Sequence, residues 1–193
     1  MITERKEIGP GTGGENKRTL LLLCHGLTII FLLAITFLAF WSWNRLPAKV
    51  PVHFGADGLP DRWAEKGGEF VSLFAVPWLL TGMMYGFSRL TPWFRRHPQW
   101  LNIPNKKKFL ALPPERQAPF FAMLDLFYAG MAASLNLLFL LMNIASVQIA
   151  LGTWDRLPWW SIWLPLAVIF SVAIANTVWM AVVVKNLTRD GKP

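Results

Sequence analysis

The chain has 193 residues, of which 54% are hydrophobic, and it carries 11 Trp and 14 Phe. Such an apolar composition excludes an ordinary soluble domain and indicates an integral membrane protein. The net charge of +8 does not indicate nucleic acid, because the basic residues lie beside apolar segments, where anionic lipid headgroups are the expected partner. The single cysteine, Cys24, excludes a disulfide within the chain.

The N-terminal part of the chain predicts a tail followed by a membrane span. Residues 1–19 mix glycines with charges, which is typical of a flexible tail. Residues 20–43 contain no Asp, Glu, Lys or Arg, and at about 1.5 Å per residue they can cross a hydrocarbon core of about 30 Å. The run is too long for a signal peptide and ends in Trp41 and Trp43 rather than a small-residue cleavage site, so we expect a retained span.

Residues 44–69 form the one long segment that is neither apolar nor simply basic, and we expect an ordered loop here. Prolines and glycines prevent a continuous helix, and the alternation around Val50, Val52 and Phe54 predicts a short strand. Asp57-Gly58 predicts a turn. Asp61 is then placed to cap a short helical turn that ends at Gly67-Gly68.

The second span is predicted at residues 70–90 and the basic connection at residues 91–119. Gly82 and Gly86 form a G-x-x-x-G pattern, which allows another helix to approach closely, either within the chain or in a homo-oligomer. In the connection, basic residues alternate with aromatic residues such as Phe109, a pattern typical of a segment in the headgroup region. The predicted headgroup contacts are Arg95, Arg96, Lys106, Lys107 and Lys108.

Residues 120–151 and 159–184 predict the third and fourth spans, followed by a short tail at 185–193. The third span has a small-residue face suited to helix packing, made of Ala129, Gly130, Ala133 and Ser134. The fold class we expect is an all-α integral membrane protein, a four-helix antiparallel bundle with a small ordered extracytoplasmic loop made of a strand, a turn and a helical turn.

Lys and Arg are distributed unequally between the two ends of these spans. Fourteen of them lie in the N-terminal tail, the middle connection (counted with Arg89) and the C-terminal tail, and 5 lie in the two other loops. By the positive-inside rule both termini are cytoplasmic and the 44–69 loop faces outward. We therefore expect a multi-pass membrane protein with this orientation.

Four polar residues inside the spans are candidates for structural or transport roles. Asp125 is the one acidic residue within the predicted spans, and an acid at this depth needs a partner. His25 is a candidate partner because it lies at the same expected depth, and Arg89 and Lys185 are competing candidates. Asn136 and Asn176 fall near mid-membrane and are expected to bond to each other.

The loop also carries a recognisable motif. LPAKVPVHFGADGLPDRW contains a Leu-Pro, a Val-Pro-x-His-Phe and a Gly-x-Pro-Asp-x-Trp, with Lys66 beyond. This pattern resembles the signature of a bacterial membrane family catalogued as a domain of unknown function (DUF1648). NIPNKKKFLALPPER is similar to the cytoplasmic segment of four-span members. The same module opens the SdpI-type immunity proteins, which protect bacteria from a secreted toxin and can signal through a bound repressor.

The resemblance implies a binding, sensing or immunity-type protein that recognises a peptide, lipid or envelope component through residues 46–66. The residues expected to bind are His53, Phe54, Asp57, Asp61, Trp63 and Lys66. The alternatives are an accessory subunit of a larger membrane complex and, in a different class, a small transporter or metal-dependent enzyme.

His53, Asp57 and Asp61 lie at four-residue intervals and are of the types that hold a divalent metal, but the prolines and glycines keep them off one helical face. In the structural interpretation, Asp61 caps the helical turn, Trp63 anchors the loop at the membrane interface and Lys66 contacts a lipid headgroup or a carboxylate. No serine, cysteine or second histidine accompanies His53 in the loop, so we expect no catalysis and no cofactor.

Overall fold

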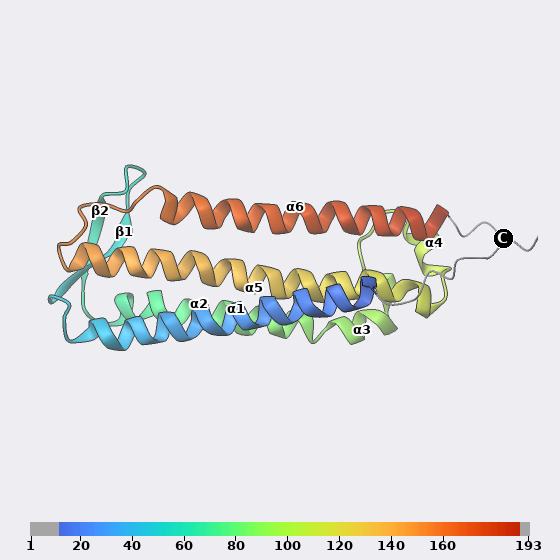
Figure 1. Cartoon of the computed structure of the whole chain (residues 1–193), viewed down its shortest axis with the longest axis horizontal. Coiled ribbons are helices and arrows are strands. Elements are labelled where there is room, and N and C mark those ends of the chain that lie inside the picture. The colour runs from blue at the N-terminus through green and yellow to red at the C-terminus, as the bar shows by residue number, and fades with distance from the viewer. Residues whose placement is uncertain (1–11, 190–193) are drawn as a thin grey trace, which may run out of the picture.

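The computed structural model describes residues 12–189, which form four long helices, a two-stranded sheet and three short helices. The long helices are α1 (Thr12–Trp43), α2 (Gly68–Ser88), α5 (Pro114–Ala150) and α6 (Trp160–Arg189). They run antiparallel along the long axis of the molecule (Figure 1). All four are long and apolar enough to cross a membrane, which confirms the predicted spans and fold class.

Helix α5 is the centre of the bundle, because α1, α2 and α6 all pack most extensively against it. Figure 1 shows α6 on one side of α5, with α1 and α2 on the other. The predicted small-residue face of α5 is buried. A Cβ added at Gly130 would lie 3.2 Å from Val172 Cγ1, so the missing side chain lets α6 approach closely.

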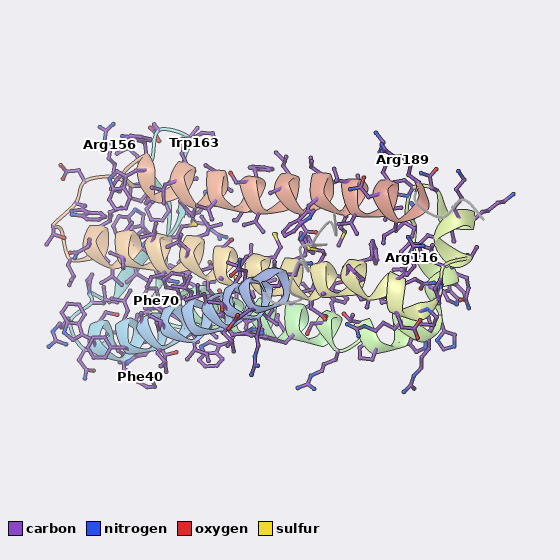
Figure 2. All side chains as sticks on the ribbon, turned by 45° about the vertical axis from the view of Figure 1, so that its right-hand side comes forward. Phe40, Phe70, Arg116, Arg156, Trp163 and Arg189 are labelled. Atoms are coloured by element: carbon purple, nitrogen blue, oxygen red, sulfur yellow. The ribbon has the colours of Figure 1, made fainter. Side chains whose placement is uncertain are left out.

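The two ends of the bundle differ. We call one the hairpin end, where β1 (Lys49–Phe54) and β2 (Pro60–Glu65) lie beside the connection between α5 and α6 (Figure 1). We call the other the basic end, which holds α3 (Thr91–Arg96), η1 (Pro98–Trp100) and α4 (Lys106–Leu110). Figure 2 shows Arg116 and Arg189 at the basic end and Arg156 at the hairpin end, in line with the unequal charge distribution.

The segment after the turn at Asp57-Gly58 is a strand, and the helical turn predicted there is wrong. Residues 60–65 pair antiparallel with β1, with Lys49 opposite Glu65 and Phe54 opposite Pro60. Cross-strand hydrogen bonds pair the facing backbone groups of the two segments, and this non-local pairing outweighs the local cap signal of Asp61. The turn itself is confirmed, since Gly58 has a φ of +79°, a conformation that glycine adopts readily.

Two further predictions need correction at the chain ends and in the basic connection. Residues 12–19 belong to α1 and residues 185–189 to α6, whereas residues 1–11 and 190–193 of the predicted tails lie outside the described residues. Phe109, predicted at the lipid interface, is fully buried in a cluster with Phe120, Phe121 and Val184. The side-chain amide of Gln117 donates to the carbonyls of Phe109 and Leu112, so α4 is folded against the bundle.

Candidate functional site

The hairpin is fixed to the helices at three places. The hydroxyl of Ser146 on α5 donates to the carbonyl of Pro51 at 3.0 Å. The amide of Leu157 donates to the carbonyl of Gly58 at 2.8 Å. At the third place, Lys66 Nζ donates to the carbonyl oxygens of Trp43 at 2.6 Å and Leu46 at 3.3 Å. The hairpin is therefore an ordered cap on this end of the bundle.

Lys66 has a different role from the one predicted. Its ammonium group satisfies the carbonyl of Trp43, the last residue of α1, which has no partner within the helix, and the carbonyl of Leu46 just beyond it. The ammonium group also lies 5.3 Å from the centroid of the Trp43 ring. A cation at this end of a helix is also favoured by the helix dipole. Lys66 therefore ties the end of β2 to the end of α1 rather than reaching a headgroup or carboxylate.

The inner face of the hairpin packs into a hydrophobic cluster. Val50 is fully buried together with Ile35 of α1, Phe70 of α2 and Val147 of α5. Burying a side chain such as that of valine contributes about 1.5 to 3 kcal/mol. Figure 2 shows Phe70 within this end of the bundle. Because three helices and β1 share the cluster, the position of the hairpin is coupled to the helix packing beneath it.

Beside this cluster lies a cavity of about 180 Å³, which we call the cap cavity. It lies among β1, α2, α5, the start of α6 and the connection that precedes α6. Most of its surface is apolar, and its lining residues are Val52, His53, Phe54, Leu73, Phe139, Met142, Asn143, Ser146, Leu157 and Ile162. An engineered apolar cavity of about 150 Å³ binds benzene. The cap cavity can therefore accept one aromatic ring or a short length of alkyl chain, but not a whole peptide.

His53 and Asp61 meet at the exposed rim of this cavity. His53 Nδ1 lies 2.6 Å from Asp61 Oδ1, with 63% and 50% of the two side chains exposed. An ionised carboxylate only accepts hydrogen bonds, so Nδ1 carries the proton and a neutral ring presents Nε2 as an acceptor. Asp61 therefore orients the histidine instead of capping a helix as predicted.

The third member of the predicted metal set is engaged elsewhere. Asp57 Oδ1 accepts a hydrogen bond from the amide of Leu59 at 3.0 Å, which stabilises the turn. Within residues 12–189, no three His, Cys, Asp or Glu side chains lie close enough together to hold a metal ion. Trp63 is 47% exposed, and its interface role stays a prediction.

The cavity also contains residues that were absent from the predicted site. Asn143 Nδ2 donates to the carbonyls of Leu73 and Phe139, and Ser146 holds β1 as described above. The signal that could have revealed them is their spacing, because two polar residues three apart in an apolar span lie on one helical face. That face points toward the hairpin.

The polar residues at the basic end have partners other than those predicted. Asp125 pairs with Arg95, with 3.8 Å between Oδ2 and Nη2, rather than with His25, Arg89 or Lys185. His25 Nδ1 instead lies 2.7 Å from the hydroxyl of Tyr85, with the two rings stacked. The prediction failed because it did not include the short helix α3, which packs against α5 and places Arg95 beside Asp125.

The predicted bond between Asn136 and Asn176 is also wrong. Asn136 Nδ2 donates to Thr81 Oγ1 at 2.6 Å, whereas Asn176 Nδ2 donates to the carbonyl of Met123 at 3.3 Å. The contact of Asn176 with Met123 shows that the two asparagines lie at different heights along α5, about 20 Å apart at 1.5 Å per residue. Each instead ties a different neighbouring helix to α5.

The Gly82–Gly86 face of α2 is not used for packing within the described chain. Apart from the glycine itself, its chain neighbours and the adjacent backbone of α2, no described atom lies within 4 Å of a Cβ built at either position. Their predicted role in packing within the chain is therefore wrong for residues 12–189. The face remains open to lipid or to another protein.

The comparisons with known proteins give one match. Neither a curated protein nor a solved structure matches this chain. One family model does match, and its range runs from the middle of α1 through both strands to Thr81 in α2. It contains the full motif, the His53–Asp61 pair and the β1 side of the cap cavity. The predicted resemblance is therefore confirmed for this segment: residues 29–81 match the family described as Domain of unknown function (DUF1648).

Proposed function

We propose that this protein is a binding or sensing membrane protein that takes one apolar group of an envelope ligand into the cap cavity. The observation that carries the proposal is the cavity itself, about 180 Å³ in size and bounded on one side by the strand that bears the family motif. Its apolar lining suits an acyl chain end or a hydrophobic side chain of a peptide. Recognition without chemical turnover is the activity we propose.

The rim supplies the polar part of this recognition. His53 is held by Asp61 and presents Nε2 beside the cavity, where a ligand hydroxyl or amide can donate to it. A few placed polar groups at an apolar pocket fix the orientation of a ligand. The resemblance to SdpI-type immunity proteins makes a toxin-directed immunity or signalling role the more specific form of the proposal.

For orientation we propose that the hairpin end faces outward from a bacterial cytoplasmic membrane and that both termini are cytoplasmic. The 14-to-5 distribution of Lys and Arg supports this. The cap cavity then lies near the outer leaflet, where it can meet lipids and secreted molecules.

The test uses a phospholipid whose acyl chain ends in a photoreactive diazirine, with the full chain in nanodiscs. Crosslinking at Phe54 and Met142 should saturate with probe concentration, whereas crosslinking at Phe170, which is 61% exposed, should rise in proportion to it. Ile162→Trp should fill the cavity and abolish the saturable crosslinks. Leu164→Trp, at a residue of the same helix that is 51% exposed, should leave them unchanged. Unsaturable crosslinking at Phe54 and Met142 that is insensitive to Ile162→Trp would refute the proposal.

A second candidate function is that of a subunit in a larger assembly, including a homo-oligomer. It is favoured by the open Gly82–Gly86 face, because glycines on a lipid-facing surface permit close helix contact. Gly86→Leu should lower the mass of the complex measured by light scattering in mild detergent. Gly26→Leu, at a glycine of α1 that is equally open within the described chain, is the matched control. An unchanged mass for both variants would argue against assembly through this face.

A further inference from the structure

A pocket of about 450 Å³ lies at the basic end, among α1, α2, α3 and α5, and the proposed function does not use it. We call it the arginine pocket, because Arg89 and Arg95 both line it. Asp125 is the one acidic residue among the residues that line it, so the fully ionised groups of the pocket carry a net charge of +1. The charge therefore favours an anion over a metal cation.

The ion pair within the pocket leaves donors available. Arg95 Nη2 lies 3.8 Å from Asp125 Oδ2, which is longer than a charge-assisted hydrogen bond. A guanidinium has five N–H donors in a planar fork, so a single long contact leaves most of them for a ligand. Asp125 therefore holds the Arg95 side chain near the pocket without using up its donors.

Thr91 supplies an independent observation. Its side chain is 1% exposed, it lines the pocket, and its hydroxyl has no hydrogen-bond partner among the described residues. A buried polar group without a partner is costly, and such groups are uncommon in native structures. An oxyanion in the pocket would accept a hydrogen bond from this hydroxyl.

A histidine and a tyrosine complete the polar wall. His25 Nδ1 and the Tyr85 hydroxyl are 2.7 Å apart, and both residues line the pocket. This bond fixes the histidine ring and leaves its Nε2 free to donate when Nδ1 accepts from Tyr85. Two arginines, a hydroxyl and an imidazole are the groups that recur around bound phosphate.

We propose that the arginine pocket binds a phosphate group. The phosphate belongs either to the headgroup of an anionic phospholipid or to a soluble phosphate compound. A second cavity of about 470 Å³ shares Arg95 and Asp125 with it and adds Lys17, Arg18 and Glu115, so it brings one further net positive charge close to the bound anion. The site lies at the opposite end of the bundle from the cap cavity, and neither proposal depends on the other.

The test uses the purified full chain in mild detergent. Native mass spectrometry with added phosphatidylglycerol or phosphatidylcholine examines the lipid source, and titration calorimetry with inorganic phosphate examines the soluble source. The variants are Arg89→Gln and Thr91→Val, with Arg189→Gln as the control, because Arg189 is an exposed arginine at the same end of the bundle that is not among the residues lining the pocket.

We expect wild type to retain one phosphatidylglycerol in preference to phosphatidylcholine. Arg89→Gln should weaken retention about 10-fold or more, since a hydrogen bond to a charged group is lost. Thr91→Val should also weaken it, without lowering the melting temperature, because the variant removes a hydroxyl that has no partner in the described chain. Arg189→Gln should change retention by less than about twofold.

Binding of inorganic phosphate that is weakened by Arg89→Gln and Thr91→Val, but not by the control variant, would support the site and assign it to a soluble ligand. The proposal would be overturned if phosphatidylglycerol was retained no better than zwitterionic phosphatidylcholine and inorganic phosphate did not bind, or if Arg189→Gln weakened binding as much as Arg89→Gln did. It would also be overturned if Thr91→Val bound as tightly as wild type.

Discussion

Replacing Gly58 with alanine tests whether the hairpin is docked on the connection between α5 and α6. Gly58 has a φ of +79°, and an added Cβ would lie 2.7 Å from the carbonyl oxygen of Leu157. The two atoms would have to separate by about 0.7 Å to reach the 3.4 Å at which ordinary contact begins. That movement breaks or lengthens the hydrogen bond from the Leu157 amide to the Gly58 carbonyl, now 2.8 Å.

The magnitude follows from three contributions. A non-glycine residue in the left-handed region costs about 1 kcal/mol. Loss of the hydrogen bond costs about 1 kcal/mol, and displacement of Leu157, which is only 4% exposed, costs about 1 kcal/mol of packing. Gly58→Ala should therefore lower the free energy of unfolding by about 3 kcal/mol.

Gly152→Ala is the matched control. Gly152 also has a positive φ, +71°, but apart from the glycine and its chain neighbours no described atom lies within 4 Å of its built Cβ. Its replacement should cost only the backbone contribution of about 1 kcal/mol. Both free energies would come from equilibrium unfolding in mixed detergent micelles, followed by far-ultraviolet circular dichroism. Equal losses for the two variants would refute the docking of the hairpin on Leu157.

Two other predictions concern topology and the ion pair at the basic end. A cysteine at Ala56, which is exposed in the hairpin turn, should react with an impermeant thiol reagent in intact cells or spheroplasts. A cysteine at Asn105 should react only after lysis. The reverse pattern would invert the proposed orientation. Arg95→Leu should lower the melting temperature in detergent more than Asp125→Leu, because it leaves a partly buried carboxylate unpaired while Asp125→Leu removes a costly charge together with its contact. Equal and negligible shifts would show that Asp125 is satisfied by water.

The sequence alone determined the features that depend on local composition. Apolar runs of sufficient length predicted four spans, because the bilayer selects for length and hydrophobicity. The turn at Asp57-Gly58 was predictable because only a few residues adopt a positive φ. The small-residue face of α5 was visible from its helical spacing, and the loop motif was sufficient to identify the DUF1648 segment.

Only the tertiary structure decided which groups meet. Residues 60–65 form a strand because β1 lies beside them, so a partner distant in sequence replaced the local helix signal of Asp61. Asp125 meets Arg95 because α3 packs against α5. The two asparagines do not bond to each other, because a side chain's partner depends on the register and rotation of neighbouring helices. Periodicity within one helix carries no information about that register. The cap cavity likewise exists only where β1, α2, α5 and α6 converge, so its lining could not be assembled from any single segment.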